Sequence, residues 1–172
     1  VIRGSIALWR ACFPRARGAN VRMCDRKGGP VRRTPVVDGD FVHFVGLRAL
    51  NMSFCTQVTD AAFVHLRGIK RLNMYLCDQD TITDAAFVHL KGIQELDMSG
   101  CDQATITDAA FAHLVGIQRL SIYGFDQATI TDAAFMHLRG NKVLNMSLCR
   151  QLTDAAFEHL KGIYTLFMWE CN

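Results

Sequence analysis

The 172-residue sequence lacks the features that mark several large classes of protein. It has no run of about 18 consecutive apolar residues, which is the length that a membrane-spanning helix needs. It has no Gly-rich phosphate-binding loop, no HExxH metal-binding motif and no Gly-x-Ser-x-Gly nucleophile motif. These absences predict a soluble protein that is not an enzyme and that uses no cofactor, metal or membrane.

Acidic residues are almost absent from the first 35 positions, which form a basic head. This segment contains nine Lys and Arg residues and one acid, Asp25, whereas residues 36–172 contain ten basic and fifteen acidic residues. The formal charges are therefore +8 and −5, which together give the net charge of +3. A solvated cap is the favoured interpretation of the head. Nucleic-acid binding and a mitochondrial transit role are less favoured, because interleaved aromatic residues and hydroxyl residues are scarce there.

What the chain does contain is one pattern, Thr-Asp-Ala-Ala-Phe-x-His-Leu-x-Gly, written five times. The copies begin at Thr59, Thr83, Thr107, Thr131 and Thr153. A degenerate copy, VDGDFVHFVGL, begins at Val37. Self-similarity with a period of 20–50 residues indicates a solenoid or another repeat array, in which each unit packs on its neighbours.

Each repeat divides into a helical half and a strand half. Thr or Asp caps the start of a helix, Phe63 and Leu66 form one apolar stripe, and a glycine ends the turn. In the second half, Leu72 and Met74 alternate with polar residues, which predicts a strand with one buried face. One strand and one short helix fill a repeat of this length.

The strand half, IKRLNMYLC in the repeat that ends at Cys77, resembles the LxxLxMxxC signature of leucine-rich repeats. The closing cysteine, followed by Gln and a Thr-Asp helix start, is similar to the cysteine-containing subclass found in the substrate-recognition half of many F-box proteins. The resemblance covers residues 36–172. It implies an α/β fold, a curved leucine-rich-repeat solenoid (horseshoe) with a parallel β-sheet on the concave face and short helices or 3₁₀ turns on the convex face. Six repeats would start near 37, 59, 83, 107, 131 and 153.

The head fits the phase of the repeats as a terminal cap. We expect a helix over residues 5–13, a possible capping strand over 16–24 and a loop over 25–35, which is rich in Gly, Pro and basic residues. One internal repeat departs from the pattern, because Asn141 stands where its neighbours have Ile or Leu. A buried Asn without a partner would cost about 1–3 kcal/mol, so we expect the weakest junction there.

The repeated histidines and cysteines raise the question of metal binding. The histidines are His43, His65, His89, His113, His137 and His159. Zinc ligands must converge on one ion, whereas packed helices lie about 8–10 Å apart, so we interpret the histidines as scaffold.

Cysteines recur at the strand ends, but strands about 4.8 Å apart hold their Cβ atoms too far apart for disulfides. Reduced, buried thiols are the favoured interpretation, with disulfides or metal as minor alternatives, and they predict an intracellular, cytoplasmic or nuclear location. A Gln that follows each cysteine position is interpreted as a hydrogen-bonding residue of the turn.

The residues that vary between repeats are the candidates for binding, because the repeated ones build the scaffold. Strand alternation places them on the exposed concave face. The candidate partner-binding residues are Arg71, Asn73, Tyr75, Glu95, Asp97, Ser99, Arg119, Ser121, Tyr123, Asn145, Phe167 and Trp169. Tyr, Trp and Arg are enriched at binding hot spots. The alternatives are a solvated face with mutual ion pairs, and coverage of Phe167 and Trp169 by a further repeat.

These observations predict a scaffold that binds an unknown protein partner through its concave face. The resemblance implies a narrower alternative, the substrate-recognition part of an F-box-type ubiquitin ligase with a ubiquitin-ligase adaptor as partner. Nucleic-acid binding through the basic head is the least favoured alternative. If the concave face binds, Asp97→Ala and Tyr123→Ala should weaken binding and leave the fold intact.

Overall fold

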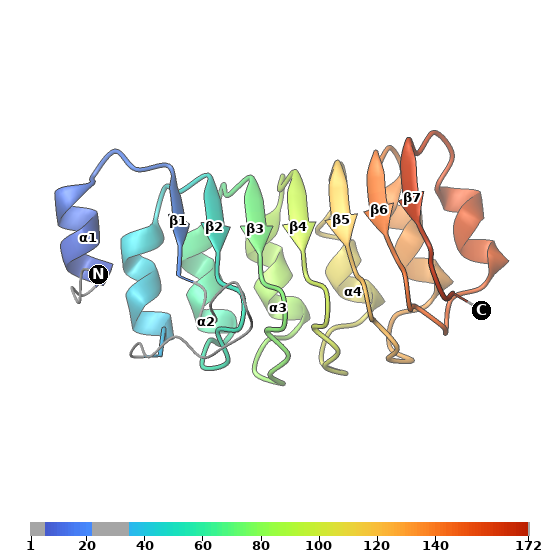
Figure 1. Cartoon of the computed structure of the whole chain (residues 1–172), viewed down its shortest axis with the longest axis horizontal. Coiled ribbons are helices and arrows are strands. Elements are labelled where there is room, and N and C mark those ends of the chain that lie inside the picture. Colours follow the sequence, from blue (N-terminus) through green and yellow to red (C-terminus); the bar gives the residue numbers. More distant parts are fainter. Residues whose placement is uncertain (1–5, 22–34, 172) are drawn as a thin grey trace.

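The computed structural model describes residues 6–21 and 35–171, which form one row of repeats (Figure 1). Seven strands make a single parallel sheet in chain order, β1 to β7. The strands are β1 Gly18–Asn20, β2 Ala49–Asn51, β3 Arg71–Asn73, β4 Glu95–Asp97, β5 Arg119–Ser121, β6 Val143–Asn145 and β7 Thr165–Phe167. The parallel sheet predicted from the sequence is confirmed, and β1 lies within the predicted capping strand. Residues 22–24 of the predicted capping strand and most of the predicted loop 25–35 lie outside the described residues.

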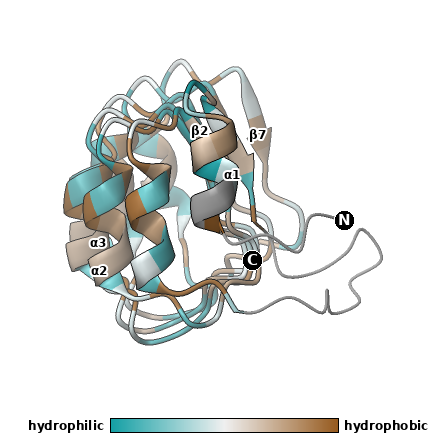
Figure 2. Cartoon of the chain, turned by 90° about the vertical axis from the view of Figure 1, so that its left-hand side faces the viewer, coloured by the Kyte–Doolittle hydropathy of each residue, from teal (hydrophilic) through white to brown (hydrophobic). Residues whose placement is uncertain are grey.

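Short helices form a second layer on one side of the sheet (Figure 2). They are α1 Ile6–Cys12, η1 Asp38–Phe44, α2 Asp60–Phe63, η2 Val64–Leu66, α3 Asp84–Phe87, η3 Val88–Leu90, α4 Asp108–Phe111, η4 Asp132–Leu138 and η5 Asp154–His159, where η denotes a 3₁₀ helix. The mixture of single α-helical turns and 3₁₀ turns agrees with the sequence prediction. None of the described helices is long and apolar enough to span a bilayer.

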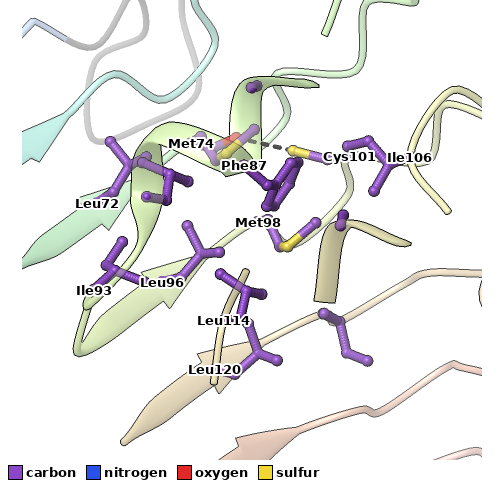
Figure 3. Close-up of a cluster of buried hydrophobic side chains, with 14 of the residues drawn as sticks. Leu72, Met74, Phe87, Ile93, Leu96, Met98, Cys101, Ile106, Leu114 and Leu120 are labelled. Carbon is purple, nitrogen blue, oxygen red and sulfur yellow. Dashed lines mark hydrogen bonds between the residues drawn. The ribbon is translucent and has the colours of Figure 1, made fainter. Parts of the chain in front are cut away.

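The core lies between the two layers and repeats with the sequence. Leu72, Leu96 and Leu120 occupy matching positions in three neighbouring strands and are each at most 3 % exposed (Figure 3). Phe87 and Met98 fill the space beneath them and are fully buried. The side chains of Leu and Met in the strand half therefore point into one continuous core. The Phe side chain of the helical half points into the same core.

The Thr-Asp pairs connect each repeat to the next. Asp84 Oδ1 accepts a hydrogen bond from the Thr107 backbone N–H at 2.8 Å, and Asp84 Oδ2 accepts one from the Thr107 hydroxyl at 2.7 Å. The same two bonds occur at all five junctions between η1 and η5, with N···O distances of 2.7–2.9 Å and O···O distances of 2.5–2.7 Å. We refer to this row as the Asp–Thr ladder. Charge-assisted hydrogen bonds of this kind are stronger than neutral ones.

The threonine of each pair has two roles at once. While its hydroxyl donates to the preceding repeat, its Oγ1 atom accepts the backbone N–H two residues later, as Thr107 does from Ala109 at 3.2 Å. This second bond is the helix N-cap that the sequence predicted. From the sequence, the aspartate was expected only to cap the start of its own helix, and its bond to the next repeat was not predicted.

A second ladder runs along the strand ends and is made of thiols. Cys101 Sγ donates to the Met74 carbonyl at 3.0 Å (Figure 3), and Cys77 Sγ donates to the Met52 carbonyl at 3.2 Å. Burial raises the pKa of the Cys77 thiol to about 12. The thiol therefore stays protonated at neutral pH, which it must do to donate. The free, buried state predicted for these cysteines is observed in the described part of the chain at Cys55, Cys77, Cys101 and Cys149.

The turns after the strands share an unusual backbone conformation. One residue in each turn from β2 to β7 has a positive φ, for example 52° at Leu76 and 67° at Gly100. This conformation costs an L-residue about 1–2 kcal/mol, so glycine is the unstrained choice there. The turn bends the chain inward and brings the cysteine position under the sheet.

Repeat length varies only in the loop between the cysteine position and the next threonine. Thr83 follows Cys77 by six positions, whereas Thr59 follows Cys55 by four. In the longer loops a further threonine bonds back to the preceding repeat, as Thr105 does to the Ile82 carbonyl at 2.7 Å. The longer loops thus add one more bond per junction.

The predicted hydrogen-bonding role of the glutamines holds for some repeats only. Gln79 Nε2 donates to the carbonyls of Cys55 and Val58, both at 2.9 Å, and Gln103 Nε2 donates to the Cys77 carbonyl at 3.2 Å. The buried amide groups of Gln127 and Gln151 have no partner within residues 6–21 and 35–171. The buried glutamine amide groups therefore have fewer hydrogen-bond partners at the C-terminal junctions than at the central ones.

The predicted weak junction at Asn141 also lies in this C-terminal half. Asn141 is 2 % exposed, and its Nδ2 atom donates to the Ile117 carbonyl at 3.3 Å. Its Oδ1 atom has no hydrogen-bond partner among the described residues. The expectation of a buried amide is correct, and the structure adds one partner that the sequence did not indicate.

We predict that Asp84→Ala lowers the free energy of unfolding by about 1–3 kcal/mol, because the Thr107 N–H and hydroxyl both lose their acceptor. Asp154→Ala is the matched control: it removes the same carboxylate from a helix start, but Asp154 makes no Asp–Thr ladder bond to a following repeat among the described residues. Its cost should be about 0.3–1 kcal/mol, from the helix dipole alone. Urea denaturation measures both, and equal losses would contradict a stabilising ladder.

We predict that Asn141→Ile raises the free energy of unfolding by about 1–2 kcal/mol, because it removes the unpaired buried Oδ1 atom and matches the apolar residue of other repeats. The reciprocal change, Ile93→Asn, should lower the stability. Thermal and urea denaturation provide the measurement. A destabilised Asn141→Ile variant would show that the bond to the Ile117 carbonyl outweighs the cost of the buried amide.

Candidate binding surface

The outer side of the sheet, which the sequence predicted to be concave, is called the sheet face here. Strand register aligns its side chains in rows, with Arg71 beside Glu95 and Glu95 beside Arg119. The next outward row runs through Asn73, Asp97 and Ser121. The structure therefore brings the predicted candidates of neighbouring repeats side by side.

The side chains of the row through Asn73 and Asp97 form hydrogen bonds that fix the strand ends. Asp97 Oδ1 accepts the backbone N–H of Ser99 at 3.1 Å and its hydroxyl at 2.7 Å. Asp97 Oδ2 accepts from Asn73 Nδ2 at 2.9 Å, and Asn73 Oδ1 accepts from the Ser53 hydroxyl and from the Tyr75 backbone N–H. Asn145 makes the same local bond to the Ser147 N–H at 3.1 Å. These side chains form a network across the repeats rather than a set of free ligands.

The prediction that Ser99 lies exposed on this face is wrong. Ser99 is 4 % exposed, and its hydroxyl lies 2.7 Å from the Ser121 hydroxyl. The other serines at this position, Ser53 and Ser147, are also buried. The cause is the turn with positive φ, because it directs the residue before it into the hydrogen-bond network instead of outward.

Arginine and tyrosine side chains remain accessible on the face. Arg71 and Arg119 are exposed, and Tyr123 is 36 % exposed. Arg119 Nε lies 3.8 Å from Glu95 Oε1, and both side chains are largely open to solvent. Exposed pairs of this type contribute about 0–1 kcal/mol, so the predicted row of alternating charges adds little stability. Tyr75 is half-buried, because its ring packs edge-on against Phe54 at a centroid distance of 5.3 Å.

The sheet face is hollowed over β1 to β4. This groove, which both polar and apolar residues line, has a volume of about 540 Å³. Its lining residues are Gly18, Ala19, Asn20, Ala49, Leu50, Asn51, Arg71, Leu72, Asn73, Glu95 and Asp97. The contribution of β1 was missed from the sequence, since the head was interpreted only as a cap. Its polar Asn20, in phase with Asn51 and Asn73, was the available signal.

The other end of the face is aromatic. Phe167 and Trp169 are 52 % and 65 % exposed and lie on or just after β7, the last strand of the sheet. The structure thus places four of the predicted candidates, Arg71, Asn73, Glu95 and Asp97, in a groove at the N-terminal strands and two, Phe167 and Trp169, at an aromatic end at β7.

The repeated histidines lie on the helix side, away from this face. All six are half-buried, and no group of three or more metal-ligating side chains converges in the described ranges. His89 Nδ1 accepts a hydrogen bond from Arg67 Nε at 3.3 Å. Burial and then the Arg67 charge lower the pKa of His89, so this ring is neutral near pH 7.

Comparison with known proteins identifies the fold. No family model matches the sequence, and no curated protein matches it. Among solved structures, a chain in the crystal structure of the Rad7 and Elc1 complex in yeast superimposes with a TM-score of 0.57 at 19 % sequence identity. The match covers 73 % of this chain and 36 % of that one. With the parallel sheet and the short helices, it supports the assignment of the fold as an α/β leucine-rich-repeat solenoid.

The polar network changes the expectation for Asp97. We predict that Asp97→Ala lowers the free energy of unfolding by about 1–3 kcal/mol, because Ser99 and Asn73 lose their acceptor. Tyr123→Ala and Arg71→Ala should change it by about 0.5 kcal/mol or less. Urea denaturation of the three variants distinguishes them. Equal, small effects would show that Asp97 contributes as little to the free energy of unfolding as the sequence suggested.

Proposed function

We propose that the chain is a protein-interaction scaffold that binds a protein partner through its sheet face. The observation that carries this proposal is the arrangement of Arg71, Arg119 and Tyr123. They are exposed side chains of hot-spot types on a surface whose short polar groups are already hydrogen-bonded to one another.

The rigidity of this surface favours binding. The strands are joined to their neighbours by backbone bonds, and the ends of β3 and β4 are fixed by the network around Asp97. A surface that is already ordered loses little conformational entropy when a partner docks. The accessible arginines and tyrosine can therefore contribute most of their contact energy to binding.

The groove over β1 to β4 suggests the chemistry of the partner. Its lining combines the charged side chains of Arg71 and Glu95 with apolar groups of Ala19, Ala49 and Leu50, whereas Asn73 and Asp97 are hydrogen-bonded to each other. A partner segment that offers an acidic and a basic group to Arg71 and Glu95, with apolar groups beside them, complements this lining. Electrostatic complementarity of this kind sets specificity and register more than affinity.

The comparison is compatible with a binding role. The similar chain comes from a complex of two proteins, Rad7 and Elc1. The narrower hypothesis, a substrate receptor of an F-box-type ubiquitin ligase, rests on the resemblance of the strand signature to the cysteine-containing subclass. The free, protonated thiols support an intracellular location for either role.

We also propose that the chain has no catalytic activity. The Thr-Asp pairs are used in the Asp–Thr ladder, and His89 is bound to Arg67. A catalytic site needs one convergent constellation, whereas these groups recur once in each repeat.

The experiment that tests the binding role is capture of partners from a lysate with three baits. One bait is the wild-type chain and one is the Arg71→Ala/Arg119→Ala/Tyr123→Ala variant. The matched control is Arg67→Ala/Met136→Ala/Arg139→Ala, which removes exposed side chains of similar size from the helix side. We expect a partner that binds the wild type and the control but not the sheet-face variant. With the purified partner, the affinity should fall at least about tenfold, or about 1.4 kcal/mol.

Other outcomes separate the alternatives. Equal capture by all three baits would contradict binding through the sheet face. Capture of ubiquitin-ligase adaptor and cullin proteins by the baits would support the narrower hypothesis. Binding to nucleic acid that weakens steeply with salt would favour the basic head, whose exposed members in the structure include Arg15 and Arg17.

A further inference from the structure

The connections between helices and strands separate the charges of the chain. In Figure 1, the connections that lead from a helix to a strand lie along the upper edge of the sheet, and those that lead from a strand to a helix lie along the lower edge. We call the upper edge the basic rim. It is formed by residues 13–17, 45–48, 67–70, 91–94, 112–118, 139–142 and 160–164.

The basic rim contains many cations and no Asp or Glu. Its cations are Arg15, Arg17, Arg48, Arg67, Lys70, Lys91, Arg139, Lys142 and Lys161. All of them are exposed except Lys70, which is half-buried. In the connections that follow β2 to β7, the charged residues are Asp78, Asp80, Asp102, Asp126, Glu170 and a single base, Arg150. The formal charge of −5 for residues 36–172 conceals this separation.

Some of the rim cations are held in place by the next repeat. Arg48 Nη1 donates to the Gly68 carbonyl at 3.0 Å, and Lys70 Nζ donates to the Gly92 carbonyl at 2.8 Å. These carbonyls follow the ends of helices, where a cation complements the helix dipole. An arginine has five N–H donors and a lysine has three, so both side chains keep donors for a further acceptor.

Other rim cations have no such structural role. Lys91, Arg139 and Lys161 donate no hydrogen bond within residues 6–21 and 35–171. The ion pair in that part of the chain joins Arg119 to Glu95 and includes no rim cation. Neighbouring strands lie about 4.8 Å apart, which is less than the Debye length of about 8 Å at physiological salt. The rim cations of adjacent repeats therefore repel one another, and their positive potentials add.

Aromatic side chains lie at both ends of the rim. Tyr164 is 82 % exposed, and Lys142 Nζ lies 5.1 Å from the centre of its ring. The same position is also exposed in the inner repeats, at Gln94, Gln118 and Lys142, where another repeat follows. Phe13, at the other end of the rim, is 52 % exposed.

A groove beside Phe13 has the size of a small-molecule site. Its volume is about 440 Å³, and Trp9, Phe13 and Arg15 contribute to its lining. Trp9 is fixed by an edge-on contact with Phe44, at a centroid distance of 6.5 Å. One groove thus holds aromatic rings, on which a base can stack, and a guanidinium group, which can bind a phosphate.

These features discriminate between three kinds of anionic partner. An acidic peptide supplies carboxylates but no repeated ring to stack on Phe13 and Tyr164. An anionic membrane would extend over both borders of the rim, where its negative surface would meet Glu95 of β4 and Glu158 of η5. A single-stranded nucleic acid is narrow, and each of its nucleotides supplies a phosphate and a base.

We propose that the basic rim binds single-stranded nucleic acid, with phosphates along the row of cations and bases stacked on Phe13 and Tyr164. The phosphates offset the repulsion between rim cations, which otherwise opposes folding. Arg15 and Arg17 of the basic head form one end of this row, and its other members come from the repeats. The proposal does not involve the sheet-face side chains of Arg71, Arg119 and Tyr123, so it stands independently of the proposed function.

The test measures the binding of a fluorescent oligothymidylate of about 20 nucleotides by fluorescence anisotropy, between about 50 and 200 mM salt. The cation variant, Lys91→Gln/Arg139→Gln, lowers the net charge of the rim by two. The matched control, Arg150→Glu, lowers the net charge by the same amount at the opposite edge. The ring variant, Phe13→Leu/Tyr164→Leu, removes the aromatic rings and keeps the charge. Circular dichroism with thermal melting establishes that each variant is folded.

We expect the wild type and the control to bind equally, with an affinity that falls as salt rises. The cation variant should bind at least about tenfold more weakly at the lowest salt concentration. Its plot of log K against log salt should be less steep by about 1.4, because each phosphate contact on a single strand contributes about 0.7 to the slope. The ring variant should bind at least about fivefold more weakly, with an unchanged slope.

Absence of binding by the wild type would overturn the proposal. So would equal losses in the cation variant and the control, or full affinity in the ring variant. A loss confined to Arg15→Gln/Arg17→Gln would place the site in the basic head alone and would also overturn it. Polyglutamate and vesicles of phosphatidylserine and phosphatidylcholine are the other anionic probes. If either binds the wild type more tightly than the oligothymidylate does at the same salt concentration, the partner is an acidic peptide or a membrane and the proposal is wrong.

Discussion

The bond between an aspartate and the threonine of the next repeat is the constraint on which this solenoid depends. A helix of one or two turns has too few internal hydrogen bonds to be stable in isolation. The Asp–Thr ladder satisfies donors at each helix start from the preceding repeat, and the same threonine caps its own helix. The helix therefore forms only when its neighbour is in place. Stability and repeat stacking are one property in this molecule.

The core of the repeats could be predicted from the sequence, but the exposed surface could be predicted only in part. The Leu and Met alternation in the strand half and the Phe and Leu stripe in the helical half are local patterns, and the core they predicted is present at Leu72, Leu96 and Phe87. The alternation of exposure failed at Ser99 because the strands are three residues long, so strict alternation ends at Asp97. Beyond that point the turn decides which way a side chain points. Bonds between residues more than 20 positions apart, such as those of Asp97 and Asn141, have no local signal.

The candidate binding residues fall into two groups: those that hold the strand ends by hydrogen bonds and those that do not. Asn73, Asp97, Ser99 and Asn145 hold strand ends, so evolution can change them only at a cost in stability. Arg71, Arg119 and Tyr123 do not hold strand ends, so they can be substituted to suit a partner without loss of these bonds. A leucine-rich-repeat surface of this type separates support from recognition within a single strand. Residues of the two kinds lie next to each other, which is why an inventory of polar positions overestimates the binding site.

The loop between the cysteine position and the next threonine absorbs the whole difference between repeats of 22 and 24 residues. The Asp–Thr distances are the same on either side of that difference. The junction is therefore insensitive to the length of the connection, and a gene for this protein can gain or lose a complete unit without altering those that remain. Copy number is then a free variable of the architecture. The reach of the sheet can change by unequal crossing-over between its near-identical segments, without any new solution to the problem of folding.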